Sequence, residues 1–376
     1  MTSEVIRREF ATRIPELDGL RGIAVGIVLV WHFVGAMLDT SLGAWTKIVY
    51  HTTILGRTGV DLFFVLSGFL ITGIILDRKQ SAVHFLKHFY IRRVLRIVPS
   101  YALLVIVFWL VVFSGVNDPV FNSETPWWRH ITFTQNLWMA EHERWGPGAV
   151  SVTWSVAIEE QFYMVFPVLA LLTPRRLLPG LLLCIAVFSC FFRAVAFVEF
   201  SSVYTMYVHT ISRLDGLAMG GLIAYFWRSP VFDSWLANHS GAFRRWFIVM
   251  CAGVPLLAIG IADNLARNMA VWGHTYLTLF YGTCLIFILR SLGSPNFAWL
   301  RSRSLGRLGL ISYTVYLFHP LLLSVVFLLV QRPQRLSSAG DVLLAAGALL
   351  LTLLWSSISL RWLEKPLTHF GRQWRY

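Results

Sequence analysis

The stretch ELDGLRGIAVGIVLVWHF, from Glu16 to Phe33, decides the fold, because it is apolar enough to enter a lipid bilayer and yet carries ionisable side chains. Arg21 stands near its start and His32 lies deep inside it. Ionisable groups in hydrocarbon are costly, so they mark either a function or a buried partner. Their spacing of eleven residues is almost three helical turns, so both side chains share one helix face, about 16 Å apart.

The chain as a whole is far more apolar than a soluble protein. Of its 376 residues 56% are hydrophobic and 14% are charged, and the mean hydropathy is +0.64. A soluble domain carries about a quarter charged residues. Apolar runs of about 17–25 residues, the length that crosses a bilayer, recur along the whole chain. We therefore predict an all-α polytopic membrane protein with about ten transmembrane helices, near residues 20–38, 57–76, 98–116, 152–172, 180–199, 212–227, 246–263, 272–290, 308–330 and 342–362.

The net charge of +13 does not indicate a nucleic-acid partner. Most of the 32 Lys and Arg residues fall in every second connection between the predicted spans, whereas a nucleic-acid-binding protein gathers them on one face. This distribution follows the positive-inside rule and predicts that both termini are cytoplasmic. Residues 1–15 contain no apolar core, so we do not expect a cleavable signal peptide. The four cysteines show no metal-ligand spacing, and no metal site is predicted.

Ionisable side chains recur in the middle and outer half of the predicted spans. Besides His32 they are Asp61, Glu159, Glu160, Asp215 and His319. Buried charges need partners, and charges contributed by several spans are what a shared polar cavity would collect. A scatter of unrelated structural ion pairs is the alternative.

Basic residues gather before the third predicted span. The segment HFLKHFYIRRVLRIVP, from His84 to Pro99, is predicted to form an interfacial helix on which Arg92, Arg93 and Arg96 share a side. The arginines can anchor the chain to anionic lipid. With Arg21 at the same level they can also bind a phosphorylated cytoplasmic ligand, because the arginine fork suits phosphate.

Small residues recur in the second predicted span and directly before it. The glycines are expected to let neighbouring helices approach closely; they are Gly56, Gly59, Gly68 and Gly73. Ser67 lies among them. We expect its hydroxyl to bond within its own helix rather than to act as a nucleophile.

Ordered blocks of sequence resemble those of a known family, the membrane-bound acyltransferase family 3, which includes O-acetyltransferases of bacterial surface polysaccharides. The blocks are LDGLRGIAVGIVLVWH (17–32), GVDLFFVLSGFLIT (59–72), FYIRRVLRIVPSY (89–101), TWSVAIEEQFYMVFP (153–167), RLDGLAMGGLIA (213–224), ISYTVYLFHP (311–320) and EKP (364–366). The resemblance implies ten core transmembrane helices in a bacterial inner membrane. It covers nearly the whole chain, so we expect residues 1–376 to form one acyltransferase membrane domain. The soluble domain that some relatives carry is not expected here.

The resemblance also implies a site. The family's Arg-x10-His element falls on Arg21 and His32, its Arg-x-x-Arg element on Arg93 and Arg96, and its tryptophan–glutamate element on Trp154 and Glu159. Together with the charge pattern, it predicts that CoA phosphates bind Arg21, Arg93 and Arg96, with Arg92 as a lesser candidate. His32 is expected to be the general base, oriented by a carboxylate, Glu159 in first place and Asp61 in second. Asp215, His319 and Glu160 are expected to line the acceptor side.

On these grounds the chain is predicted to be an O-acyltransferase that uses acyl-CoA, by default acetyl-CoA, as co-substrate and no tightly bound cofactor. The acceptor is expected to be a hydroxyl of a cell-envelope carbohydrate or glycolipid. The main alternative is a transporter or flippase, because polytopic chains with ionisable residues at the midplane also carry solutes. A non-catalytic membrane scaffold or sensor is a third interpretation. No oligomeric state is predicted.

Overall fold

The computed structural model describes residues 14–374 except 40, 42, 79, 117, 201–202 and 264–268. All regular structure in this part of the chain is helical, which confirms the predicted all-α class. The helices are α2 (Pro15–Phe33), α3 (Ala44–Thr53), α4 (Gly59–Leu76), α5 (Ala82–Phe113), α6 (Trp127–Ile131), α7 (Gln135–Glu141), α8 (Thr153–Leu172), α9 (Leu178–Phe200), α10 (Val203–Val208), α11 (Thr210–Phe226), α12 (Pro230–Asn238), α13 (Ser240–Asp263), α14 (His274–Arg290), α15 (Arg303–Leu329), α16 (Ala339–Ser359) and α17 (Lys365–Gly371). Shorter 3₁₀ and π segments are Gly35–Met37, Ile54–Thr58, Gly148–Val150, Met269–Gly273, Pro295–Arg301 and Leu360–Glu364.

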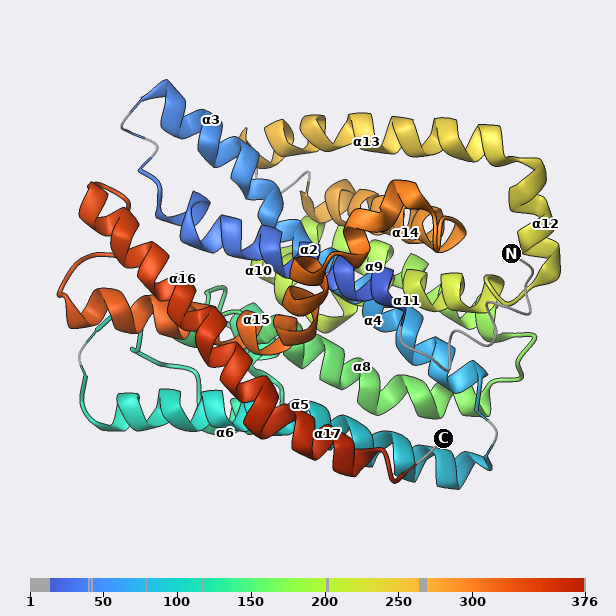
Figure 1. The fold of residues 1–376 in the computed structure, drawn as a ribbon, viewed down its shortest axis with the longest axis horizontal. Coiled ribbons are helices and arrows are strands. Elements are labelled where there is room, and N and C mark those ends of the chain that lie inside the picture. Colours follow the sequence, from blue (N-terminus) through green and yellow to red (C-terminus); the bar gives the residue numbers. More distant parts are fainter. Residues whose placement is uncertain are drawn as a thin grey trace.

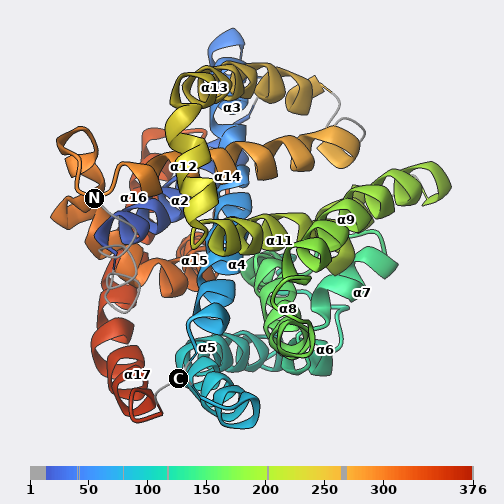
Figure 2. The ribbon, with the colours of Figure 1, turned by 90° about the vertical axis from the view of Figure 1, so that its right-hand side faces the viewer.

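Most of the long helices run along one direction of the molecule (Figure 1). Helix α3 lies at one end of this bundle, and α12 lies at the other. The view along the bundle places α4 near its middle, with α2, α11 and α15 around it (Figure 2). The core is therefore built from helices that are far apart in the sequence.

In the described part of the chain, seven helical segments are long and apolar enough to cross a membrane by themselves. They are Pro15–Met37, Ala44–Leu76, Ala82–Phe113, Thr153–Leu172, Leu178–Val198, Arg303–Leu329 and Ala339–Gly371. A bent pair, α14 with Pro295–Arg301, passes the same test together, with a bend of 112°. Helices also occupy the other predicted spans, but α11 and α14 have 17 residues each, which is at the lower limit for a span. The protein is thus a polytopic helical membrane protein, while ten spans and cytoplasmic termini stay predictions.

Glycines permit the closest helix contacts, as predicted for the second span. A Cβ atom on Gly68 of α4 would overlap the carbonyl group of Leu217 on α11. In the same interface, a Cβ on Gly220 of α11 would overlap the backbone of Val65. Gly56 and Gly59 lie equally close to the backbone of α2, whereas Gly73 meets only the flexible end of the Arg228 side chain. Where the backbones of two helices touch, no flexible side chain lies between them that could move aside. Helix α4 is therefore held at a fixed distance from α2 and α11.

We expect Gly68→Ala to destabilise the protein by about 1–3 kcal/mol, the usual cost of inserting a methyl group into a packed interface. Gly347→Ala on α16 is the matched control, because a Cβ there meets no atom within 4 Å. This control is expected to leave stability unchanged or to raise it by up to about 1 kcal/mol, since alanine favours the helix over glycine. Apparent Tm values of both variants in the same detergent measure the difference. Equal Tm values would contradict the packing argument.

The basic segment before the third predicted span does not form a separate interfacial helix. Helix α5 continues through Pro99 for 32 residues, from Ala82 to Phe113. A proline inside a helix removes one backbone donor and can bend the helix without ending it. As a result, Arg93 and Arg96 stand on the same rigid element as the apolar residues that follow them.

Candidate active site

Helices α2, α4, α5, α8 and α15 surround a cavity that is partly open to solvent. Its walls hold a group of charged side chains that sequence analysis singled out, namely Arg21, Arg93, Arg96, Glu159 and Glu160. Arg96 is exposed, and the others are partly buried. The structure therefore brings together, from three helices, residues that are up to 139 positions apart in the sequence.

The arginines of this cavity, Arg21, Arg93 and Arg96, are called the arginine cluster below. Arg21 has only a loose partner, with 3.9 Å between its Nη1 and Asp18 Oδ1. The Arg93 guanidinium lies 5.0 Å from the ring centre of Tyr163 and 5.5 Å from that of Phe89, in cation–π geometry. Such contacts hold a guanidinium in place without neutralising it, so the cluster keeps positive charge that a phosphate could use.

Arg92 is oriented differently, although it is next to Arg93 in the sequence. It does not line the cavity, and the stem of its side chain lies beside Gly371 at the end of α17. Neighbouring positions on a helix point about 100° apart, which separates the two arginines. The structure therefore gives no support to Arg92 as a ligand-binding residue of the cavity.

The two carboxylates of the cavity have different surroundings. Ser67 donates a hydrogen bond of 2.6 Å to Oε1 of Glu159, which corrects the expectation that this hydroxyl bonds within its own helix. Oε1 of Glu160 is buried and has no hydrogen-bond partner among the described residues. An unpaired buried acceptor is costly, so a donor from a ligand or water is expected at Glu160.

His32 lies at the far end of α2 from Arg21, and its ring centre is 4.7 Å from that of His319 on α15. His319 is fully buried. Its ring is 5.9 Å from that of Tyr316, which lines the arginine-bearing cavity. The two imidazoles therefore form a pair near Tyr316, although neither ring lines the cavity itself, and we call them the histidine pair.

The hydrogen bonds of the histidine pair determine which ring nitrogen of each neutral imidazole carries the hydrogen. Nδ1 of His32 is 3.0 Å from the carbonyl oxygen of Val28, and Nδ1 of His319 contacts the carbonyl oxygens of Val315 and Tyr316 at 3.1 and 2.8 Å. A carbonyl can only accept, so in the neutral rings Nδ1 carries the hydrogen and Nε2 has a free lone pair. Nε2 of His319 is buried and without a partner in the described chain. Both rings can therefore accept a proton at Nε2.

The expected carboxylate partner of His32 is absent among the described residues. Glu159 accepts from Ser67, and Asp61 forms an ion pair of 2.7 Å with Arg213. A backbone carbonyl instead holds Nδ1–H of His32. The structure places Asp61 beside Arg213 and not beside His32, so it gives no support to Asp61 as the residue that orients His32.

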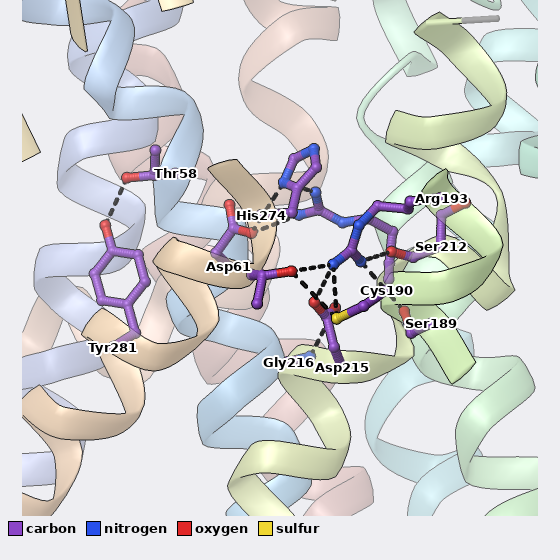
Figure 3. A network of polar contacts seen from close by, with 12 residues as sticks. Thr58, Asp61, Ser189, Cys190, Arg193, Ser212, Asp215, Gly216, His274 and Tyr281 are labelled. Carbon is purple, nitrogen blue, oxygen red and sulfur yellow. Dashed lines mark hydrogen bonds and ion pairs between the residues drawn. The ribbon is translucent and has the colours of Figure 1, made fainter. Parts of the chain in front are cut away.

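Asp61 and Asp215 belong to a buried network that joins α4, α9, α11 and α14 (Figure 3). Arg213 donates to Asp61, and Nδ1 of His274 lies 3.5 Å from the same carboxylate oxygen. Arg193 donates to Asp215 at 2.7 Å. It is also bonded to the neighbouring residues Ser189, Ser212 and Thr275. Because Asp215 is matched by a buried cation and by the N–H of Gly216, the structure does not present it to an acceptor.

A family model described as an acyltransferase domain matches residues 14–361. The chain belongs to this acyltransferase family. The match covers almost all of the described part, so the resemblance seen in the sequence is confirmed. No solved structure matches the chain significantly.

The curated relatives that this chain matches are longer proteins. The chain is 25% identical over 373 residues to an O-acetyltransferase homologue of Staphylococcus aureus strain COL, over 95% of this chain and 58% of the relative. It is 25% identical over 379 residues to the peptidoglycan O-acetyltransferase OatA of Listeria monocytogenes, covering 95% of this chain and 56% of that protein. It is 26% identical over 378 residues to the O-acetyltransferase OatA of Staphylococcus aureus strain NCTC 8325, covering 95% and 58%. The chain thus spans just over half the length of these relatives.

Several residues of the cavity and of the buried network were not predicted from the sequence. Tyr163 and Tyr316 line the cavity, and Arg193 and His274 complete the buried network. Arg193 had a detectable signal, because it is an arginine inside the apolar segment predicted to span at 180–199. The tyrosines had none, since aromatic residues are frequent throughout the chain. In the described residues no group of three or more His, Cys, Asp or Glu side chains could hold a metal ion.

Proposed function

We propose that this protein is an O-acyltransferase that moves an acyl group, acetyl by default, from cytoplasmic acyl-CoA to a hydroxyl of a cell-envelope carbohydrate or glycolipid. One observation carries the proposal. Helix α2 holds Arg21 of the arginine cluster at one end and His32 of the histidine pair at the other, about 16 Å away. A donor with an anionic head and a long thioester arm fits this separation. Membership of the acyltransferase family supports the reaction class, and the name of the Listeria relative, a peptidoglycan O-acetyltransferase, supports the acceptor class.

The arginine cluster would bind the phosphates of CoA. Arg93 and Arg96 are three residues apart on α5, so their guanidinium groups face one side, and Arg21 approaches from α2. Arginine forks bind phosphate oxygens in pairs, which fixes the donor's orientation as well as its affinity. Glu159 and Glu160 would limit the mutual repulsion of the arginines before the donor arrives. With the N-terminus inside, as the positive-inside rule predicts, this end of the bundle faces the cytoplasm of a bacterial inner membrane.

His32 would act as the general base. Its Nε2 lone pair takes the proton from the acceptor hydroxyl while the hydroxyl oxygen attacks the thioester carbonyl. The carbon–sulfur bond then breaks, and the leaving CoA thiolate takes the proton from the imidazolium. The Val28 carbonyl keeps Nδ1–H in place throughout, so that Nε2 is the nitrogen that faces the reaction. His319 would line the acceptor side and bring a second Nε2 acceptor to the same point.

The direct test uses membranes that contain the protein, radiolabelled acetyl-CoA and a bacterial envelope glycan extract. We expect release of CoA thiol together with transfer of label to the glycan. Mild base should release this label, because it is bound as an ester. Membranes from cells with the empty vector are the control. Movement of label or glycan across the membrane without any release of CoA thiol would contradict acyl transfer and favour a transporter.

A further inference from the structure

Arg57 is a cation near the histidine pair that has no acidic partner among the described residues. It belongs to the short helical segment Ile54–Thr58 that precedes α4. No Asp or Glu carboxylate of the described chain lies within ion-pair distance of it. A half-buried arginine without a counter-charge among the described residues is a candidate for binding an anionic ligand.

The guanidinium of Arg57 lies between two aromatic rings. Its central carbon is 4.9 Å from the ring centre of Tyr207 and 5.7 Å from that of Trp31. Arg213 lies against the same Tyr207 ring, at 5.5 Å, but Asp61 already matches its charge. Of the two arginines on Tyr207, Arg57 is therefore the one whose charge is left for a ligand.

More aromatic side chains continue from Tyr207. Trp145 and Trp154 lie 5.4 and 5.1 Å from its ring centre, and Tyr204 lies 5.5 Å from Trp145. Trp145 is 41% exposed, so part of its ring is open to a ligand. We call Trp31, Trp145, Trp154, Tyr204 and Tyr207 the aromatic cluster. Flat aromatic faces pack against the C–H faces of sugar rings, so this cluster suits a carbohydrate.

The aromatic cluster adjoins the histidine pair. Trp31 directly precedes His32 on α2, and a Cβ on Gly56, next to Arg57, would touch the Trp31 side chain. A group bound by Arg57 would therefore lie near the end of α2 that carries His32, the base proposed to activate the acceptor hydroxyl.

We propose that Arg57 binds an anionic group of the acceptor, so that the acceptor is an acidic glycan rather than a neutral one. This inference rests on the proposed function and names its substrate class. The aromatic contacts hold the guanidinium without neutralising it, so its N–H groups can donate two parallel hydrogen bonds to a carboxylate or a phosphate. A neutral sugar offers only hydroxyl acceptors, which bind a guanidinium more weakly than an anion does.

The inference can be tested by binding, without acetyl-CoA. Three oligosaccharides of equal length, one neutral, one with uronic acid and one with phosphate groups, are titrated into the purified protein by calorimetry. We expect the wild type to bind at least one acidic form about 10-fold or more tightly than the neutral form. Arg57→Gln is expected to lose that preference, and Arg57→Lys to retain part of it. Which acidic form binds tighter identifies the anion.

The matched control is Arg144→Gln. This substitution removes an exposed arginine whose charge is already paired with Glu124. It is expected to keep the preference. Equal binding of neutral and acidic forms by the wild type would overturn the inference, and this comparison needs no variant. An equal loss for all three glycans in Arg57→Gln would likewise overturn it, since that is the result of a merely structural role.

Transfer of label from acetyl-CoA to the same glycans is measured in parallel and separates the two proposals. Preferential binding of an acidic glycan without any transfer of label would contradict the acyltransferase proposal, whereas the inference that Arg57 binds an acidic glycan would still hold. Transfer to neutral and acidic glycans at equal rates, without preferential binding, would leave the acyltransferase proposal standing and overturn the acidic acceptor.

Discussion

His32→Ala is expected to reduce acyl transfer by about 10²–10⁴-fold, the usual contribution of a positioned general base, while the protein stays folded in the membrane. The reason is specific to one nitrogen. Nδ1 is held by the Val28 carbonyl, so only Nε2 can take a proton from the acceptor. The measurement is the initial rate of label transfer from acetyl-CoA to glycan at equal amounts of inserted protein. A loss in kcat with little change in the KM for acetyl-CoA is expected, because the donor's phosphates bind elsewhere.

His142→Ala is the matched control for this variant. Nδ1 of His142 makes the same kind of bond, at 3.0 Å, to the carbonyl of Trp138 four residues earlier. Residue His142 is exposed and belongs to a different segment of the chain from the histidine pair. Removing it eliminates an equivalent local contact without touching the histidine pair. Full activity in His32→Ala, or an equal loss in both variants, would contradict the assignment of His32 as base.

The spacing of Arg21 and His32 is a feature that the sequence predicts well. Eleven residues apart on an uninterrupted apolar run, they had to share one helix face, and the structure has both on α2. The close approach at Gly68 was predictable for a similar reason, because small residues in membrane helices have few other uses. Periodicity and local composition contain this information.

The partners of Asp61 and Asp215 could not be predicted in the same way. Asp61 meets Arg213 and Asp215 meets Arg193, and each pairing depends on how α4, α9 and α11 pack in three dimensions. Hydrophobic patterning states which residues are buried but not which helix lies beside which. Both aspartates therefore looked like functional candidates, whereas the structure shows each matched by a buried arginine.

The orientation of His32 shows a second kind of limit. A carboxylate was expected beside it by analogy with catalytic triads, and Glu159 was the first candidate. In the structure Glu159 lies with Ser67 in the arginine-bearing cavity. A backbone carbonyl can hold a ring N–H as well as a carboxylate can, and every residue of a helix has one. The type of side chain required at a site therefore cannot be deduced from the role alone.

Arg93→Gln and Arg96→Gln are each expected to raise the KM for acetyl-CoA by about 10–100-fold, because a hydrogen bond to a charged group contributes about 1.5–3 kcal/mol. Arg92→Gln is the matched control, since it removes an arginine one residue away whose side chain does not line the cavity. It is expected to change the KM by less than about 3-fold. Initial rates of CoA thiol release over a range of acetyl-CoA concentrations give the three values.

A second donor isolates the phosphate contact from any general disturbance of the cavity. S-acetylpantetheine has the same thioester arm but no phosphate, so it has nothing for the arginine cluster to bind. We expect the wild type to use it poorly, and Arg96→Gln to use it as well as the wild type does, so that the two losses do not add. If the substitution instead lowers activity with both donors by the same factor, the arginine acts on the shape of the cavity and not on phosphate. Because Arg96 has like charges beside it in the cluster, its removal is not expected to lower the apparent Tm.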